Sequence, residues 1–143
     1  MDLDEMFYHA LKADRQLMAA VSGRVKSTCF EVSPEEIDNT PTPCLIVGDD
    51  GLQNDDTTKD TEWESEEDRV QASVEIDADS PKEVKRLLLM VRRAIARYMA
   101  GQEQIPELLG VQTSGVAWDW MKPCYHETIS YQCVVENHLY DED

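Results

Sequence analysis

The first clear pattern of apolar positions lies at the start of the chain. Apolar residues recur at intervals of three and four over residues 3–21, and only Asp14 interrupts the stripe. This spacing predicts one amphipathic helix of about five turns, which the Ser22-Gly23 pair ends. Residues 25–32 then predict a short strand, and the segment 33–43, which contains three prolines, predicts turns.

Strand patterns occupy much of the remaining chain. The apolar run 44–47 predicts a buried strand that ends at the following glycine. Apolar and polar residues alternate over 70–77, which indicates a half-buried strand with one wet face. Two further runs, 111–120 and 125–137, also predict strands, and the segment 121–124 between them reads as a hairpin connection.

A second amphipathic helix is predicted for residues 81–100. Asp79 or Ser80 caps its start, Pro81 takes the first helical position, and Glu83 stands three residues after Ser80. Gly101 ends it. Away from the apolar stripe, this helix carries six basic residues, namely Lys82, Lys85, Arg86, Arg92, Arg93 and Arg97.

The order of these segments predicts the fold class. Helix, strands, charged loop, strand, helix and hairpin follow one another, with no internal repeat and no linker. We expect a single α+β domain over residues 1–143, with a mostly antiparallel sheet and two amphipathic helices packed on one face. A chain of 143 residues is long enough to bury a core of its own.

Charge narrows the classes of partner. The chain has 13 basic and 30 acidic residues, a net charge of −17. Ten acidic residues and one lysine fall within 49–68, which predicts a flexible acidic loop there. The excess of acidic residues over the whole chain argues against tight binding of nucleic acid and against binding to anionic membranes. No segment is long and apolar enough to span a bilayer, and the acidic start does not resemble a secretory signal, so a cytoplasmic location is expected.

No catalytic or cofactor-binding motif is visible. The chain lacks a glycine-rich phosphate loop, a GxSxG nucleophile elbow and an HExxH zinc motif. The three histidines, His9, His126 and His138, are scattered and have no evident partners. We therefore predict no catalytic residues, no cofactor and no enzymatic activity.

Metal binding is a weaker alternative at two places. The cysteines Cys29, Cys44, Cys124 and Cys133 form no CxxC pair, which favours reduced, buried thiols. The sharper alternative is a zinc site made of Cys124, His126, Cys133 and His138. A second alternative is a divalent cation on Asp49, Asp50, Asp55 and Asp56. The spacing of these aspartates does not match an EF-hand, so a solvated loop is favoured and no metal site is predicted.

The uneven charge distribution is the most specific feature. The basic helix either neutralises acidic groups of its own monomer or meets the acidic loop of a neighbouring copy, and the sequence favours neither. Head-to-tail pairing of copies closes into a ring if the rotation allows. The candidate interface residues are Asp55, Asp56, Asp60, Glu62, Trp63, Glu64, Lys85, Arg86, Arg92, Arg93 and Arg97.

The chain also resembles a known family. The segment Leu-Lys-Ala-Asp-Arg-Gln-Leu-Met-Ala-Ala-Val-Ser-Gly-Arg-Val at 11–25 is similar to the start of the tail-terminator (tail-completion, minor tail) proteins of long-tailed phages and prophages. The proline-preceded strand 41–47, the strand and helix of 70–97 and the last strand 125–137 match the family's later elements. The similarity is one of pattern and covers most of the chain.

The resemblance implies a structural role in virion assembly. Members form a homo-oligomeric ring, typically a hexamer, that caps the tail tube and joins it to the head, without a cofactor. The implied partners are tail-tube and head-completion proteins, and the implied location is the host cytoplasm during assembly and then the virion tail. Residues 49–68 correspond best to the family's inter-subunit loops. An acidic adaptor, or an inhibitor that mimics nucleic acid and binds a basic partner, is the alternative.

Overall fold

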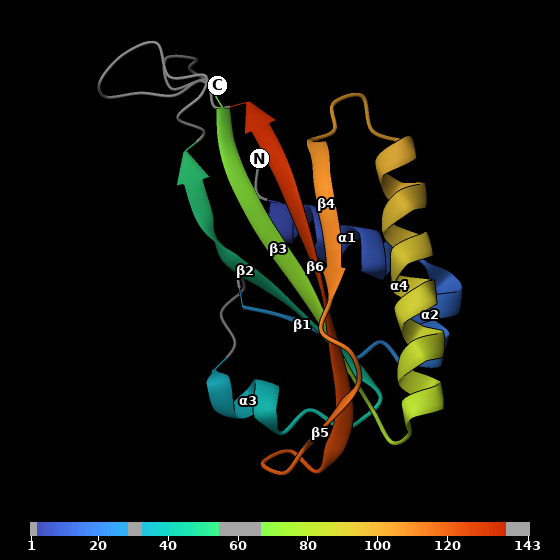
Figure 1. Ribbon diagram of the computed structural model, residues 1–143. Helices are drawn as coiled ribbons and strands as arrows, with labels where there is room; N and C mark the ends of the chain where they lie inside the picture. Colours follow the sequence, from blue (N-terminus) through green and yellow to red (C-terminus); the bar gives the residue numbers. More distant parts are fainter. Residues whose placement is uncertain (1–2, 29–32, 55–66, 137–143) are drawn as a thin grey trace.

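One sheet and a layer of helices make up the fold in the computed structural model, which describes residues 3–28, 33–54 and 67–136 (Figure 1). Along the chain the elements are α1 (Leu3–Ala13), α2 (Arg15–Ala20), β1 (Val25–Ser27), α3 (Pro34–Asp38), β2 (Cys44–Asn54), β3 (Glu67–Ala78), α4 (Pro81–Ala100), β4 (Glu107–Thr113), β5 (Ala117–Asp119) and β6 (Cys124–Glu136). The predicted α+β class is confirmed.

The six-stranded sheet is mostly antiparallel. Its strand order is β1-β2-β3-β6-β4, and β5 pairs with β6 beyond the end of β4. Only β1 and β2 run parallel, and all other pairs are antiparallel. In the centre, Val74 of β3 lies opposite Val47 of β2 and Ile129 of β6, so these apolar side chains share one face.

The core lies between that face and the helices. Alternation along β3 turns Ala72, Val74 and Ile76 toward the helices, and all three are fully buried. Helix α4 buries a stripe made of Val84, Leu87, Val91, Ala94 and Ile95, as its 3.6-residue period requires. The ring of Phe7 in α1 meets the ring of Tyr131 in β6 edge-on, with 4.9 Å between centroids. Two helices thus cover one face of the sheet (Figure 1).

The first helix is not continuous, contrary to the prediction of one helix over 3–21. Helix α1 ends at Ala13, and α2 begins at Arg15. Asp14 is the N-cap of α2: its backbone is extended, and its Oδ1 accepts a hydrogen bond from Leu17 N at 2.9 Å. The polar residue that interrupts the apolar stripe therefore begins a second helix, because its carboxylate satisfies an otherwise unpaired N–H group.

The predicted acidic loop is shorter than 49–68. Strand β2 continues through Asn54 and β3 begins at Glu67, so the loop prediction was wrong for 49–54 and 67–68. The ladder extends to Asn54 opposite Asp68, with a bulge between Asp49 and Gly51. Because backbone groups form the ladder, a charged segment can prolong a hairpin that apolar residues begin. The rest of the predicted loop, 55–66, lies outside the described residues.

Smaller differences concern the other elements. Helix α3 lies in the segment predicted as turns, with Ser33 as N-cap and Pro34 at its first position. The run 111–120 is two strands, β4 and β5, and between them Gly115 has a φ of +80°. Of the predicted strand 25–32, β1 covers Val25–Ser27, and residues 29–32 lie outside the described part. None of the described helices has the length and apolar character that a membrane span needs.

Candidate functional site

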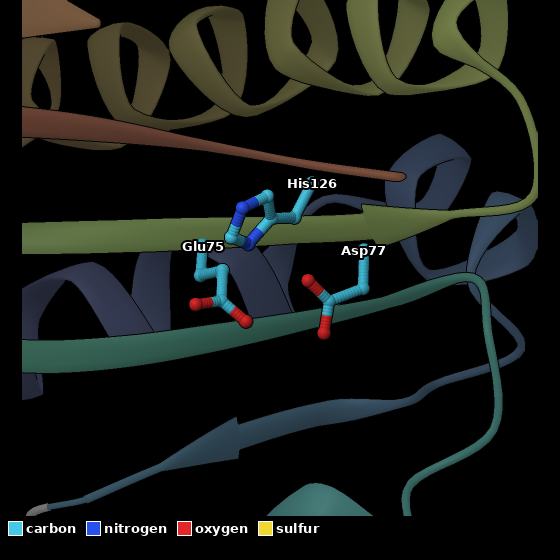
Figure 2. Close-up of side chains that lie close together, drawn as sticks. All are labelled: Glu75, Asp77 and His126. Atoms are coloured by element: carbon cyan, nitrogen blue, oxygen red, sulfur yellow. The ribbon is translucent and has the colours of Figure 1, made fainter. Parts of the chain in front are cut away.

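The sheet face turned away from the core carries a cluster of titratable side chains. Cys44 of β2 lies opposite Asp77 of β3, and Asp77 lies opposite His126 of β6. Glu75 stands two residues before Asp77 and shares its face, because side chains along a strand alternate. Figure 2 shows Glu75, Asp77 and His126 directed toward one another. Three strands therefore bring these groups together.

Asp77 is buried although the sequence placed it on a wet face. Its exposed fraction is 1%. Lys122, from the turn before β6, donates a hydrogen bond from Nζ to Asp77 Oδ2 at 2.7 Å and lies 3.4 Å from Cys44 Sγ. The Cys44 thiol donates a longer bond to the same Oδ2, at 3.7 Å. The β5–β6 turn thus supplies a cation that compensates a carboxylate buried on this face.

Burial and like charge shape the acid–base properties of the cluster. Burial, followed by hydrogen bonding to and repulsion from Asp77, raises the pKa of Glu75 to about 8. Burial by itself lowers the pKa of Lys122, but the hydrogen bond and charge of Asp77, with a contribution from Cys44, outweigh it and raise the pKa. The ammonium group is therefore held in its charged form.

The nearby thiols are not activated. Burial raises the pKa of both Cys44 and Cys124 to about 11, so both stay protonated at neutral pH. Cys133 is likewise buried, with a pKa raised to about 11. All three are free cysteines, which confirms the predicted reduced, buried thiols for these positions, while Cys29 lies outside the described residues.

Two buried atoms of the cluster have no hydrogen-bond partner among the described residues. They are Asp77 Oδ1 and His126 Nδ1. One ligand atom from each of Glu75, Asp77 and His126 can be chosen so that all three lie within 4.8 Å of one another. Carboxylate oxygens and an imidazole nitrogen are ordinary ligands of divalent metal ions, so these side chains could hold one.

The zinc set considered from sequence does not assemble. Cys124 and His126 lie on the outer face of β6. Cys133 is nine residues from Cys124 and seven from His126, so it faces the other side of the strand, toward the helices, where it joins the core. That alternative is wrong for these three residues, and His138 lies outside the described part. Sequence reasoning missed Glu75 and Asp77 as companions of His126, because nothing local predicts that β3 and β6 are neighbours.

The basic interface candidates all lie on the exposed side of α4. Lys85 Nζ is 3.9 Å from Glu127 Oε1, and Arg97 Nη1 is 3.9 Å from Asp14 Oδ2. Arg92 offsets part of the rise that burial causes in the pKa of the Tyr131 hydroxyl. Arg86 and Arg93 have no ion-pair partner in the part of the chain that the structure describes. The candidates Asp55, Asp56, Asp60, Glu62, Trp63 and Glu64 lie outside that part.

Large apolar side chains are exposed at two separate places on the edge that β4 and β5 form, the start of β4 and the β5–β6 hairpin. Ile105, Leu108 and Leu109 at the start of β4 are 55%, 54% and 46% exposed. In the β5–β6 hairpin, Trp120 and Met121 are 85% and 94% exposed. We call this surface the β4–β5 edge. No sequence pattern singled it out, because Ile105, Leu108 and Leu109 lie before the predicted strand 111–120 and Met121 lies in the predicted hairpin connection.

Comparison of the chain with models of known protein families finds no match, and comparison with curated proteins finds no significant match.

Proposed function

We propose that the chain is a structural subunit of a phage or prophage tail or neck assembly. In this proposal it acts as a tail terminator, a homo-oligomeric ring that caps the tail tube and joins it to the head. Its partners are tail-tube and head-completion proteins, and assembly takes place in the host cytoplasm. The single observation that carries the proposal is the apolar β4–β5 edge.

An apolar edge of this kind favours a protein partner. Exposed apolar side chains that lie close together, such as Ile105, Leu108 and Leu109 at the start of β4, mark interaction sites on proteins, and β4 ends the strand order of the sheet. The register of β4 shifts between Leu108 and Gly110, which indicates a bulge at Leu109. Because bulges disrupt the regular ladder, we expect a neighbouring subunit to contact this edge through side chains rather than by adding a strand.

The basic face of α4 gives the assembly a direction. Arg86 and Arg93 point away from the core without partners among the described residues, and exposed Leu89 lies one helical turn from each. An apolar residue between unpaired cations suits contact with an acidic surface of another copy. Such a contact joins different faces of two subunits, which is the arrangement that produces rings.

Light scattering of the purified protein tests the proposal. We expect an oligomer of defined size that binds purified tail-tube protein, and Leu108→Asp with Leu109→Asp to shift it toward monomer. Gln112→Asp is the matched control, because it adds a charge to the same strand at an exposed polar position and removes no apolar contact. A strict monomer at high concentration without tail-tube binding contradicts the proposal.

The adaptor or nucleic-acid-mimicking alternative depends on the carboxylates of 55–66. These residues lie outside the described part of the chain, so this alternative stays a prediction. It expects competition with DNA for a basic partner, and the combined neutralisation of Asp55, Asp56, Asp60 and Glu62 to abolish that competition.

A further inference from the structure

We propose that Glu75, Asp77 and His126 form a binding site for a divalent transition-metal ion, with Zn²⁺ as the first candidate. The site lies on the outer face of the sheet, where β3 and β6 pair (Figure 2). It is independent of the assembly function, which depends on the β4–β5 edge and α4.

Strand pairing presets the positions of the three ligands. Glu75 and Asp77 are two residues apart on β3, and His126 is the direct partner of Asp77 on β6. Each ligand thus comes from a strand position that pairs with a neighbouring strand on both sides. Sites built on strands are held more precisely than sites on loops.

Unpaired buried atoms point to a missing partner. Asp77 is 1% exposed, yet its Oδ1 has no hydrogen-bond partner in the described structure, and neither does the buried Nδ1 of His126. A buried polar atom without a partner destabilises the fold, and more so when it is charged. A cation between Asp77, His126 and Glu75 would satisfy both atoms at once.

The contact with Lys122 also leaves room for a cation. The ammonium group of Lys122 engages Asp77 through Oδ2 only. Lys122 fixes the orientation of the carboxylate and leaves Oδ1 free. Outer partners that orient ligating side chains in this way are usual in metal sites.

The donor set selects the kind of metal. Two carboxylates and one imidazole suit Zn²⁺, Mn²⁺, Fe²⁺ or Co²⁺, whereas Ca²⁺ and Mg²⁺ prefer oxygen ligands alone. The chosen ligand atoms lie within 4.8 Å of one another, while a tetrahedral zinc site needs separations of about 3.3 Å, given bonds of about 2.0 Å. Rotation of the half-buried Glu75 and His126 side chains can close this difference, and water can complete the coordination.

The test is calorimetric titration of the full chain with Zn²⁺ after removal of metal by a chelator. We expect one saturable site whose affinity falls by at least about 10-fold in His126→Ala and in Glu75→Gln, since loss of even a supporting partner has an effect of this size. His9→Ala and His138→Ala are the matched controls, and both should keep the site. An effect confined to His126→Ala and Glu75→Gln distinguishes the proposed site from weak metal binding elsewhere on the surface.

Substitution by Co²⁺ gives a second readout. Visible absorption reports the coordination of the metal, and ligation by the proposed nitrogen and oxygen atoms gives d–d bands without a sulfur-to-cobalt charge-transfer band. The proposal is overturned if the wild type shows no saturable site, or if both His126→Ala and Glu75→Gln bind as the wild type does. Should His126→Ala fail to fold, the nearly isosteric Glu75→Gln decides alone.

Discussion

At the scale of single residues, Asp77 is held by several contacts at once. It is a carboxylate with 1% exposure, held by Lys122 at 2.7 Å and contacted by the thiol of Cys44. A buried charge is tolerated only when it is compensated, and removing one partner of a buried pair leaves the other without compensation. The stability of this region therefore depends on a lysine in a turn, a position that would otherwise tolerate substitution.

We expect Lys122→Met to lower the free energy of unfolding by about 3–5 kcal/mol, because it leaves the Asp77 carboxylate buried without a cation. Urea denaturation with chelator present measures the change. The double variant Lys122→Met with Asp77→Asn should recover much of the loss, since the amide carries no charge. A loss below about 1 kcal/mol for the single variant would show that the pair is not needed.

The pH dependence of stability should carry the signature of Glu75. Its pKa is about 8 in the folded protein, against an ordinary value of 4.5, because burial and the neighbouring Asp77 disfavour its charge. Between these values the folded chain keeps a proton that the unfolded chain has lost. The stabilisation from this group is therefore complete below pH 4.5 and is lost as the pH rises toward 8.

We expect Glu75→Gln to remove this dependence. With chelator present, the variant should be more stable than the wild type at pH 8. The difference should shrink toward pH 5, with a slope of at most about 1.4 kcal/mol per pH unit. Urea denaturation across this range measures it. Parallel curves for the two proteins would show that Glu75 titrates as an ordinary glutamate.

At the scale of the elements, three helices begin in the same way. Asp14, Ser33 and Ser80 each accept a hydrogen bond from the backbone N–H three residues later. The caps differ in what they support. Helices α2 and α4 contribute buried side chains to the core, whereas α3 contributes none. A lost cap should therefore matter most where the helix packs on the core.

We expect Asp14→Ala to destabilise the protein by about 1 kcal/mol through the lost cap of α2. Asp14→Asn keeps a capping oxygen and loses only the ion pair with Arg97, whose side chain is 64% exposed, so its effect should be small. Ser33→Ala, at the start of α3, should change global stability less than Asp14→Ala. Thermal denaturation of the three variants compares them, and equal losses for Asp14→Ala and Asp14→Asn would assign the effect to the ion pair instead.

At the scale of the whole molecule, the charges are separated. The chain carries a net charge of −17 while the exposed side of α4 is basic. Lys85 and Arg97 meet acidic groups of their own chain, whereas Arg86 and Arg93 meet none among the described residues. Neutralisation within the monomer therefore describes Lys85 and Arg97, while contact with a second copy stays a proposal for Arg86 and Arg93. Arg86 and Arg93 are the ones available to orient a second copy.

We expect Arg86→Gln with Arg93→Gln to weaken self-association at low salt and to have little effect at about 1 M salt, where screening reduces the Debye length to about 3 Å. Light scattering at several salt concentrations measures this. Lys85→Gln is the control, because its partner Glu127 lies in the same chain. Equal association of the double variant and the wild type at low salt would remove α4 from the proposed interface.

The local elements followed from the sequence because their causes are local. Alternation over 70–77 and the Ser80–Gly101 caps of α4 depend on neighbours within a few residues, and both are confirmed. Asp14 and Ser33 are also residue types that commonly cap helices. The apolar stripe on both sides of Asp14 favoured one continuous helix, and the prolines that follow Ser33 favoured turns. The length of β2 could not be read locally, since its continuation to Asn54 depends on the ladder with β3.

What the sequence alone determined, then, is the α+β class, the two-helix cover of the sheet and the separation of charge, because periodicity and composition are properties of the chain itself. Only the tertiary structure decided which polar residues meet. Asp77 lies far along the chain from Lys122 and His126 and becomes their neighbour through strand pairing and one turn. The same pairing leaves Leu108 and Leu109 on an edge, because which strand ends the sheet is settled by long-range contacts.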